Sequence, residues 1–240
     1  MTKEYKIKNE DWRLQGVTTI KKPSRGMKAE PGDVIKVCAL TTYKENEIAL
    51  GIPRAVALFL DIAFISFKDI AEMREAAVAK RDKCYIPDAS AFSYFERVMT
   101  SIIFSYTALE SFANEEIPEG YIHHQKTRGI FAALFKPTIE RRVDLDTKLG
   151  DILPQVTQII SPKGTSLWTD YLRLKEDRNR IIHLKSHDRR APYQGPPSIW
   201  ERFFSPDLPH YPEIAKNMIA YFQKDRDESR VPRWFKLLPF

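Results

Sequence analysis

The sequence has 240 residues, of which 43% are hydrophobic, 12% aromatic and 29% charged, and it carries a formal net charge of +6 at pH 7. This composition excludes an intrinsically disordered chain and indicates a globular protein with one large domain or two small ones. The excess of Lys and Arg favours polyanionic partners, with nucleic acid first among them.

The cysteines and the apolar runs exclude several kinds of site and location. Neither Cys38 nor Cys84, the two cysteines, lies near a second thiol or a histidine at ligand spacing. We therefore expect no metal site, no disulfide framework and a reducing, cytoplasmic compartment. The first 12 residues lack the apolar core of a signal peptide. The most apolar run, residues 55–67, contains Asp61 and is too short to span a membrane, so we expect no membrane association.

Residues 1–50 are predicted to form an N-terminal arm. They are rich in lysine, and prolines and glycines interrupt them between positions 23 and 32. Two segments, 17–21 and 34–43, carry the β-branched residues that are typical of strands. We expect a short β-hairpin or an extended arm that lies on the main domain.

From Pro53 onward the sequence has the periodicity of long helices. Pro53 suits the start of a helix, and Pro87 with Asp88 marks the start of the next one. Residues 120–137 are predicted to be a connection with one short helix. The predicted helices cover residues 53–83, 87–118, 146–160, 165–186, 199–203 and 211–226.

Together these helices predict an all-α fold. Residues 51–190 are expected to form an up-and-down bundle of four to five long helices. Residues 191–240 are expected to form a C-terminal helical extension packed on the bundle. The apolar tail at 231–240 is expected to pack on the body or on a partner.

The fourth long helix places an arginine in its apolar face. At about 100° per residue, Arg178 falls near the centre of an apolar arc, while Asn179 and His183 lie one turn apart on the rim. A guanidinium that points into a core is costly unless it is paired. Arg178 is therefore expected either to form a structural ion pair or to take part in catalysis. The apolar arc consists of Leu167, Tyr171, Leu174, Ile181 and Ile182.

The second long helix places a carboxylate in its own apolar stripe. Glu110 lies within that stripe, and Asn114 follows it by one turn on the same face. We expect Glu110 to pair with Arg178 across the bundle, with Asn114 or Asn179 satisfying the remaining polar atoms. The alternative is a buried ion pair that only fixes the register of the two helices.

The segment after Arg178 could support metal-independent cleavage of RNA. The amide of Asn179 can orient the imidazole of His183, and a histidine beside a bound phosphate can move protons. A base withdraws the proton of a 2′-hydroxyl, the 2′-oxygen attacks phosphorus, and a cation offsets the transition-state charge. The alternative is a half-exposed helical histidine without a role. The positive charge near this helix end comes from Arg178, Lys185, His187, Arg189 and Arg190.

The segment from Arg178 to His183, Arg-Asn-Arg-Ile-Ile-His, resembles the R-N-x-x-x-H signature of HEPN domains. These are all-helical modules that are common in prokaryotic defence systems and in RNA processing. The segment from Ala108 to Asn114 resembles a stretch that many of them carry in the preceding core helix. The resemblance covers roughly residues 53–185.

This resemblance implies a homodimer in which the two signature helices meet across a two-fold axis. Each subunit then contributes Arg178 and His183 to a shared cleft. The shared cleft solves a geometric problem, because residues five apart are about 140° apart on one helix and one subunit alone brings them together poorly. Many HEPN toxins cut RNA without a metal or cofactor and are silenced by an antitoxin, often a small nucleotidyltransferase.

We therefore expect a metal-independent endoribonuclease, a hydrolase of an antiviral defence or toxin–antitoxin system that needs no cofactor. His183 is the expected general base and acid, Arg178 the phosphate ligand, and Asn179 the residue that orients His183. Glu110 and Asn114 are expected to support them. The residues expected to bind substrate are Lys185, His187, Arg189 and Arg190.

Two other interpretations remain open. A non-catalytic HEPN-like module would bind RNA, a nucleotide or a protein partner. A helical protein unrelated to HEPN would require Glu110 and Arg178 to lie far apart. Separately, Trp200, Phe203 and Phe204 could stack bases, but we expect them to pack in the core.

Overall fold

The computed structural model describes residues 11–15, 17–19, 34–36, 38–127, 130–189, 197–226 and 231–239. The chain divides into two compact units. The first comprises Met1–Leu58 and Asp227–Phe240, and the second comprises Phe59–Arg226. The boundary between them falls inside the first helix, α1 (Ala55–Phe67).

Short antiparallel strand pairs dominate the described part of the first unit. The β3–β4 hairpin closes tightly because Lys44 and Glu45 both take the positive φ that a two-residue hairpin turn requires. The predicted N-terminal hairpin is confirmed in part, since the strands form two pairs rather than one. The elements are β1 (Val17–Thr19) paired with β2 (Val34–Lys36), β3 (Cys38–Tyr43) paired with β4 (Asn46–Gly51), and α10 (Arg233–Lys236).

The second unit is mostly helical. α1 continues into it, and a π-helical segment, η1 (Lys148–Ile152), joins α5 to α6 without a break. A short 3₁₀ turn, η2 (Ser186–Arg189), follows α7. The other helices are α2 (Ile70–Ala79), α3 (Asp88–Glu116), α4 (Lys136–Arg142), α5 (Leu145–Thr147), α6 (Leu153–Thr157), α7 (Ser166–Ile182), α8 (Ile199–Phe204) and α9 (Tyr211–Gln223).

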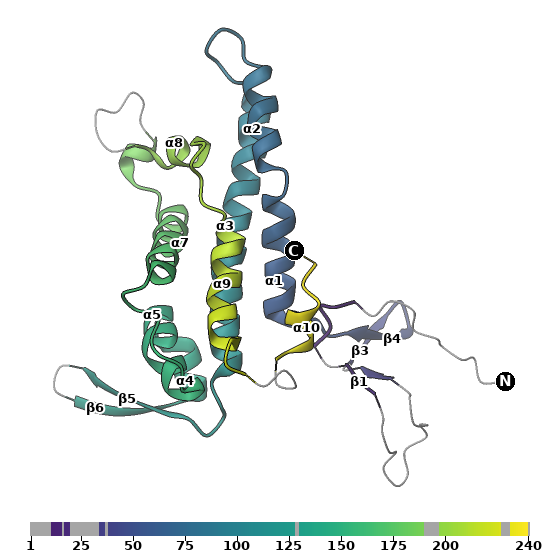
Figure 1. Cartoon of the computed structure of the whole chain (residues 1–240). Coiled ribbons are helices and arrows are strands. Elements are labelled where there is room, and N and C mark those ends of the chain that lie inside the picture. Colours follow the sequence, from purple (N-terminus) through teal and green to yellow (C-terminus); the bar gives the residue numbers. More distant parts are fainter. Residues whose placement is uncertain are drawn as a thin grey trace. The chain divides into compact units, whose positions relative to one another are not determined.

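Helix α3 is the central element of the second unit and contacts α9, α7 and α2 (Figure 1). It starts at Asp88, directly after Pro87, and continues to Glu116 because no glycine or proline interrupts it. Its apolar residues recur every three or four positions and are buried as one face. The largest of those that are fully buried are Tyr94, Ile102, Leu109 and Phe112.

A β-hairpin in the second unit corrects the all-α prediction. β5 (Ile122–Thr127) pairs antiparallel with β6 (Ile130–Phe135), within residues 120–137, where a connection with one short helix was expected. Periodicity cannot separate a strand from a helix in so short an apolar run. A short helix does follow the hairpin, as α4, and Pro137 lies in its first turn, where a missing N–H is tolerated.

Several helix boundaries were predicted and others were not. The starts of α3 and α7 are confirmed, but the helix predicted over 53–83 is broken into α1 and α2 at Lys68 and Asp69. α7 ends at Ile182 rather than near Ser186, because the backbone leaves helical geometry at His183, with φ −125° and ψ 66°. No helix within the described ranges is long and apolar enough to cross a membrane.

Candidate functional site

Helix α7 carries the R-N-x-x-x-H segment. Thr165 caps its N-terminus by accepting a hydrogen bond from the N–H of Trp168 at 3.3 Å, which stabilises the first turn. Arg178 and Asn179 lie in its last two turns, and His183 is the residue at which it ends. The sequence had placed His183 inside the helix.

The arginine buried in α7 is Arg180, and Arg178 is only half-buried. Arg180 is 9% exposed, and its guanidinium pairs with Asp188 at 2.8 Å. The buried face differs from the projected arc because α8 and α9 also pack on α7, on the side where Asp177 is buried. The prediction that Arg178 occupies the centre of the buried face is therefore wrong.

Arg178 packs on an aromatic ring of α3. Its guanidinium carbon lies 4.8 Å from the ring centre of Tyr106, within the range of a cation–π interaction. Its Nη1 donates to Oδ1 of Asn179 at 3.0 Å. Arg178 and Glu110 form no ion pair within the described ranges, so that predicted contact is wrong. Burial raises the pKa of the intervening Tyr106, Arg178 acts to lower it, and Glu110 acts to raise it.

Glu110 lies in the field of a buried lysine. Lys148 is fully buried, and its Nζ donates to the carbonyl of Glu140 at 2.9 Å. Burial lowers the pKa of Lys148, and Glu110 is the carboxylate that most opposes this lowering. Asn114 has a buried side-chain oxygen without a hydrogen-bond partner among the residues described. Glu110 thus supports the Lys148 ammonium rather than the Arg178 guanidinium.

The side chains of Asn179 and His183 are not hydrogen-bonded to each other. The Asn179 oxygen accepts from Arg178, and the backbone N–H of His183 donates to the Asn179 carbonyl at 2.9 Å. The His183 imidazole is exposed, and it has no hydrogen bond or ion pair with the described part of the chain. It is therefore open to solvent and to a ligand, and Asn179 instead fixes Arg178.

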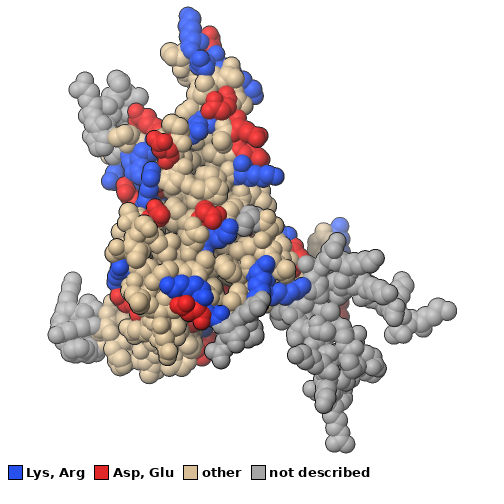
Figure 2. All heavy atoms as spheres, in the orientation of Figure 1, with Lys and Arg blue, Asp and Glu red and all other residues tan. Residues whose placement is uncertain are grey.

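Cationic side chains surround the end of α7. Lys185 and Arg189 are both exposed, whereas the side chain of His187 and all of Arg190 lie outside the described residues. In Figure 2, Lys and Arg side chains gather over the region of α7 and α8, with acidic side chains beside them. The expected substrate-binding charge is thus accessible at Lys185 and Arg189.

A hydrogen-bonded cluster that the sequence did not predict links α5 to α7. Tyr171 donates its hydroxyl proton to Asp146 at 2.5 Å, and Lys175 pairs with the other oxygen of Asp146. Burial raises the pKa of Tyr171, and the bond to Asp146 raises it further. The sequence did offer one signal for this cluster. Tyr171 and Lys175 lie four residues apart, and Arg178 follows three residues later, so the three side chains share one face of the helix.

Two aspartates around the end of α7 were also missed. Asp177 accepts from the hydroxyl of Tyr211 at 2.8 Å and pairs with Arg202 at 2.6 Å. Asp188 accepts from Arg180 and from the N–H of Ile199, both at 2.8 Å. Both carboxylates therefore fix α7 to the elements that follow it, and their positions in the sequence did not reveal their distant partners.

Comparisons with protein-family models, with curated proteins and with solved structures find no match to this chain. Within the described residues, no three His, Cys, Asp or Glu side chains are grouped so that they could hold a metal ion. What the geometry offers is an exposed imidazole and exposed cations at one helix end, beside a half-buried guanidinium. Such groups can bind a phosphate and exchange protons with it.

Proposed function

We propose that the protein is a metal-independent endoribonuclease of a prokaryotic defence or toxin–antitoxin system, acts in the cytoplasm and is related to HEPN domains. The observation that carries the proposal is the exposed imidazole of His183, which has no partner in the described chain and lies near the exposed cations Lys185 and Arg189. An imidazole in this setting can reach an RNA phosphate and the hydroxyl beside it.

The proposed reaction is an internal transesterification. His183 accepts the proton of the 2′-hydroxyl, a bond forms between the 2′-oxygen and phosphorus, and the bond from phosphorus to the 5′-oxygen breaks. The leaving 5′-oxygen takes a proton from an imidazolium. The products are a 2′,3′-cyclic phosphate and a 5′-hydroxyl. Arg178 offsets the charge that develops on the phosphate oxygens, and Asn179 holds its guanidinium through the bond at 3.0 Å.

A homodimer is part of the proposal. In one subunit, Arg178 packs on the Tyr106 ring of α3, whereas His183 is exposed at the end of α7. The proposal therefore assigns the Arg178 and the His183 that meet at one phosphate to different subunits. Two exposed apolar side chains of α7 support pairing of two copies: Leu172 is 42% exposed and Ile182 is 51% exposed. In the proposed dimer, the two α7 helices meet across a two-fold axis, with Arg178 of one subunit beside His183 of the other.

The test is RNA cleavage in the presence of EDTA. The wild-type protein is expected to cut RNA and to leave cyclic phosphate ends, and His183→Ala is expected to reduce the rate about 100-fold or more. Arg178→Ala should also abolish most of the activity. His124→Ala, which removes an exposed histidine of β5, is the matched control and should cut normally. Cleavage that needs added magnesium, or that survives both substitutions, would contradict the proposal.

A second candidate is a non-catalytic module that binds RNA, a nucleotide or a protein partner such as an antitoxin. The observation that favours it is the confinement of Arg178 between Tyr106 and Asn179, which a purely structural arginine would also show. This candidate predicts binding of RNA or a partner without any cleavage in the same assay.

A further inference from the structure

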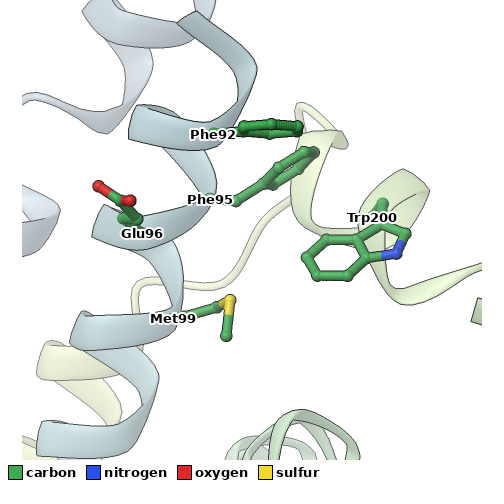
Figure 3. Close-up of a pocket in the computed structure, with 5 residues that line it drawn as sticks. All are labelled: Phe92, Phe95, Glu96, Met99 and Trp200. Carbon is green, nitrogen blue, oxygen red and sulfur yellow. The ribbon is translucent and has the colours of Figure 1, made fainter. Parts of the chain in front are cut away.

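A pocket between α3 and α8 lies apart from the groups used above. It has a volume of about 320 Å³ and is lined by Phe92, Phe95, Glu96, Met99 and Trp200. Figure 3 shows Phe92, Phe95 and Met99 on the side of α3 that faces Trp200, whereas the Glu96 carboxylate points away from Trp200. The walls of the pocket are therefore aromatic and apolar, without a carboxylate directed at an occupant.

Two walls of the pocket, Trp200 and Phe95, are held in place before any ligand binds. The indole N–H of Trp200 donates to the carbonyl of Asp188 at 2.9 Å, and its ring centre lies 5.1 Å from that of Phe95. A capping box between Ser198 and Glu201 fixes the first turn of α8. Phe92 completes the wall and keeps 60% of its surface exposed. A ligand would thus find aromatic surface whose ordering costs little.

Asp188 connects this pocket to the cationic end of α7. The residue that accepts from the Trp200 indole also accepts from the backbone N–H of Lys185 at 3.0 Å, and Arg189 follows it directly. The side chains of Lys185 and Arg189 are exposed. An apolar aromatic surface beside accessible cations is complementary to a base attached to a phosphate backbone. A cationic ligand fits less well, because the one carboxylate among the lining residues, Glu96, points away from Trp200.

We propose that this pocket binds an unstacked base of single-stranded RNA whose phosphates contact Lys185 and Arg189. The inference rests on the proposed RNA substrate and specifies its class, because a base paired inside a duplex cannot leave the stack without loss of its pairing. Phe92 supplies the accessible ring face, and Trp200 supplies the wall fixed by Asp188.

The experiment measures binding of two fluorescent probes by anisotropy. One is a short single-stranded 2′-O-methyl oligonucleotide, which lacks the attacking hydroxyl and cannot be cut. The other has the same backbone but no bases. Phe92→Ala should weaken binding of the first probe about tenfold, in the range typical of base–aromatic stacking, and should leave binding of the second unchanged. Phe92→Tyr should bind the first probe like the wild type.

The matched control is Phe135→Ala, which removes a ring of similar exposure, 58%, from β6. It should bind both probes normally. Equal affinity of Phe92→Ala and the wild type for the first probe would overturn the inference, as would equal losses on both probes. So would failure of the wild type to bind either probe, the result expected if the pocket holds a protein side chain instead.

The cleavage assay separates this inference from the proposed function. Phe92-dependent binding without cleavage by the wild type supports the pocket and contradicts the nuclease. If cleavage depends on His183 but Phe92→Ala binds the first probe like the wild type, the nuclease proposal is supported and the inference about the pocket is overturned.

Discussion

At the scale of single residues, the carboxylate of Asp188 organises the end of α7. It is buried, and it accepts from Arg180, from the backbone of Ile199 and from the backbone of Lys185. Burial acts to raise the pKa of Asp188, but these hydrogen bonds outweigh it and hold the pKa at about 2. Asp188 is therefore charged in the folded protein and links the segment after His183 to α8.

Replacement of Asp188 tests this role. Asp188→Asn removes the negative charge and leaves Arg180 buried beside a neutral amide, so the free energy of unfolding should fall by about 3 kcal/mol. Urea denaturation followed by circular dichroism measures the change. Asp151→Asn is the control, because Asp151 pairs with Lys163 at a site where both side chains are more than 40% exposed, and it should cost less than about 1 kcal/mol. Equal losses in the two variants would contradict the assigned role.

The low pKa of Asp188 also predicts a pH dependence. The folded value of about 2 lies below the usual 3.8, so the unfolded chain binds this proton more readily than the folded one. The stabilisation is complete above about pH 4 and is lost as the pH falls from about 4 to about 2, amounting to at most about 2 kcal/mol. Urea unfolding at pH 6, 4 and 3 should show a smaller decline for Asp188→Asn than for the wild type. Parallel declines would refute this prediction.

At the scale of elements, the sequence was a good guide to helices and a poor guide to contacts between them. The long run after Pro87 and the cap at Thr165 are local signals, so the starts of α3 and α7 could be predicted. The position of Arg178 could not, because packing of α8 and α9 decides which side of α7 is buried. The β5–β6 hairpin was missed because periodicity alone does not separate a strand from a helix in so short an apolar run.

In the candidate site, too, the sequence predicted the features that depend on local residues and missed the contacts between elements. The R-N-x-x-x-H segment and its cationic surroundings are local, so the sequence placed Lys185 and Arg189 near His183. The partner of Arg178 was missed because a guanidinium can pack on a tyrosine ring as well as pair with a carboxylate. The partners of Tyr171 and Asp177 lie 25 and 34 residues away in the chain, at separations that periodicity does not address.

The link between α5 and α7 yields a prediction at this scale. Tyr171→Phe keeps the buried ring but removes the hydroxyl that donates to Asp146. The free energy of unfolding should therefore fall by about 1–2 kcal/mol. Thermal unfolding measures the loss. Tyr121→Phe removes a more exposed hydroxyl that bonds to Gln155 at 2.9 Å, and it should cost less than about 0.5 kcal/mol. A larger loss of stability for Tyr121→Phe than for Tyr171→Phe would contradict the prediction that the buried hydrogen bond stabilises the protein more than the exposed one.

At the scale of the whole molecule, the proposal depends on two chains acting together. A protein of 27.9 kDa with a net charge of +6 should bind RNA more weakly as salt rises, but that behaviour does not report on a shared site. A shared site is tested only by an experiment that separates the two subunits, because Arg178 packs on Tyr106 of α3 while His183 is exposed at the end of α7. The sharpest test of the nuclease proposal is therefore an experiment on the dimer.

Mixing two inactive variants tests whether the site is shared. His183→Ala and Arg178→Ala subunits, co-expressed with different tags, form heterodimers in which one cleft pairs the intact His183 of one chain with the intact Arg178 of the other. Purified by both tags, these heterodimers should recover about half of the wild-type RNA cleavage, because one of two symmetry-related sites is complete. Each variant alone should remain inactive, and light scattering should give about twice the mass of one chain. Heterodimers as inactive as their parents would show that Arg178 and His183 do not act across the interface, and would contradict the shared site.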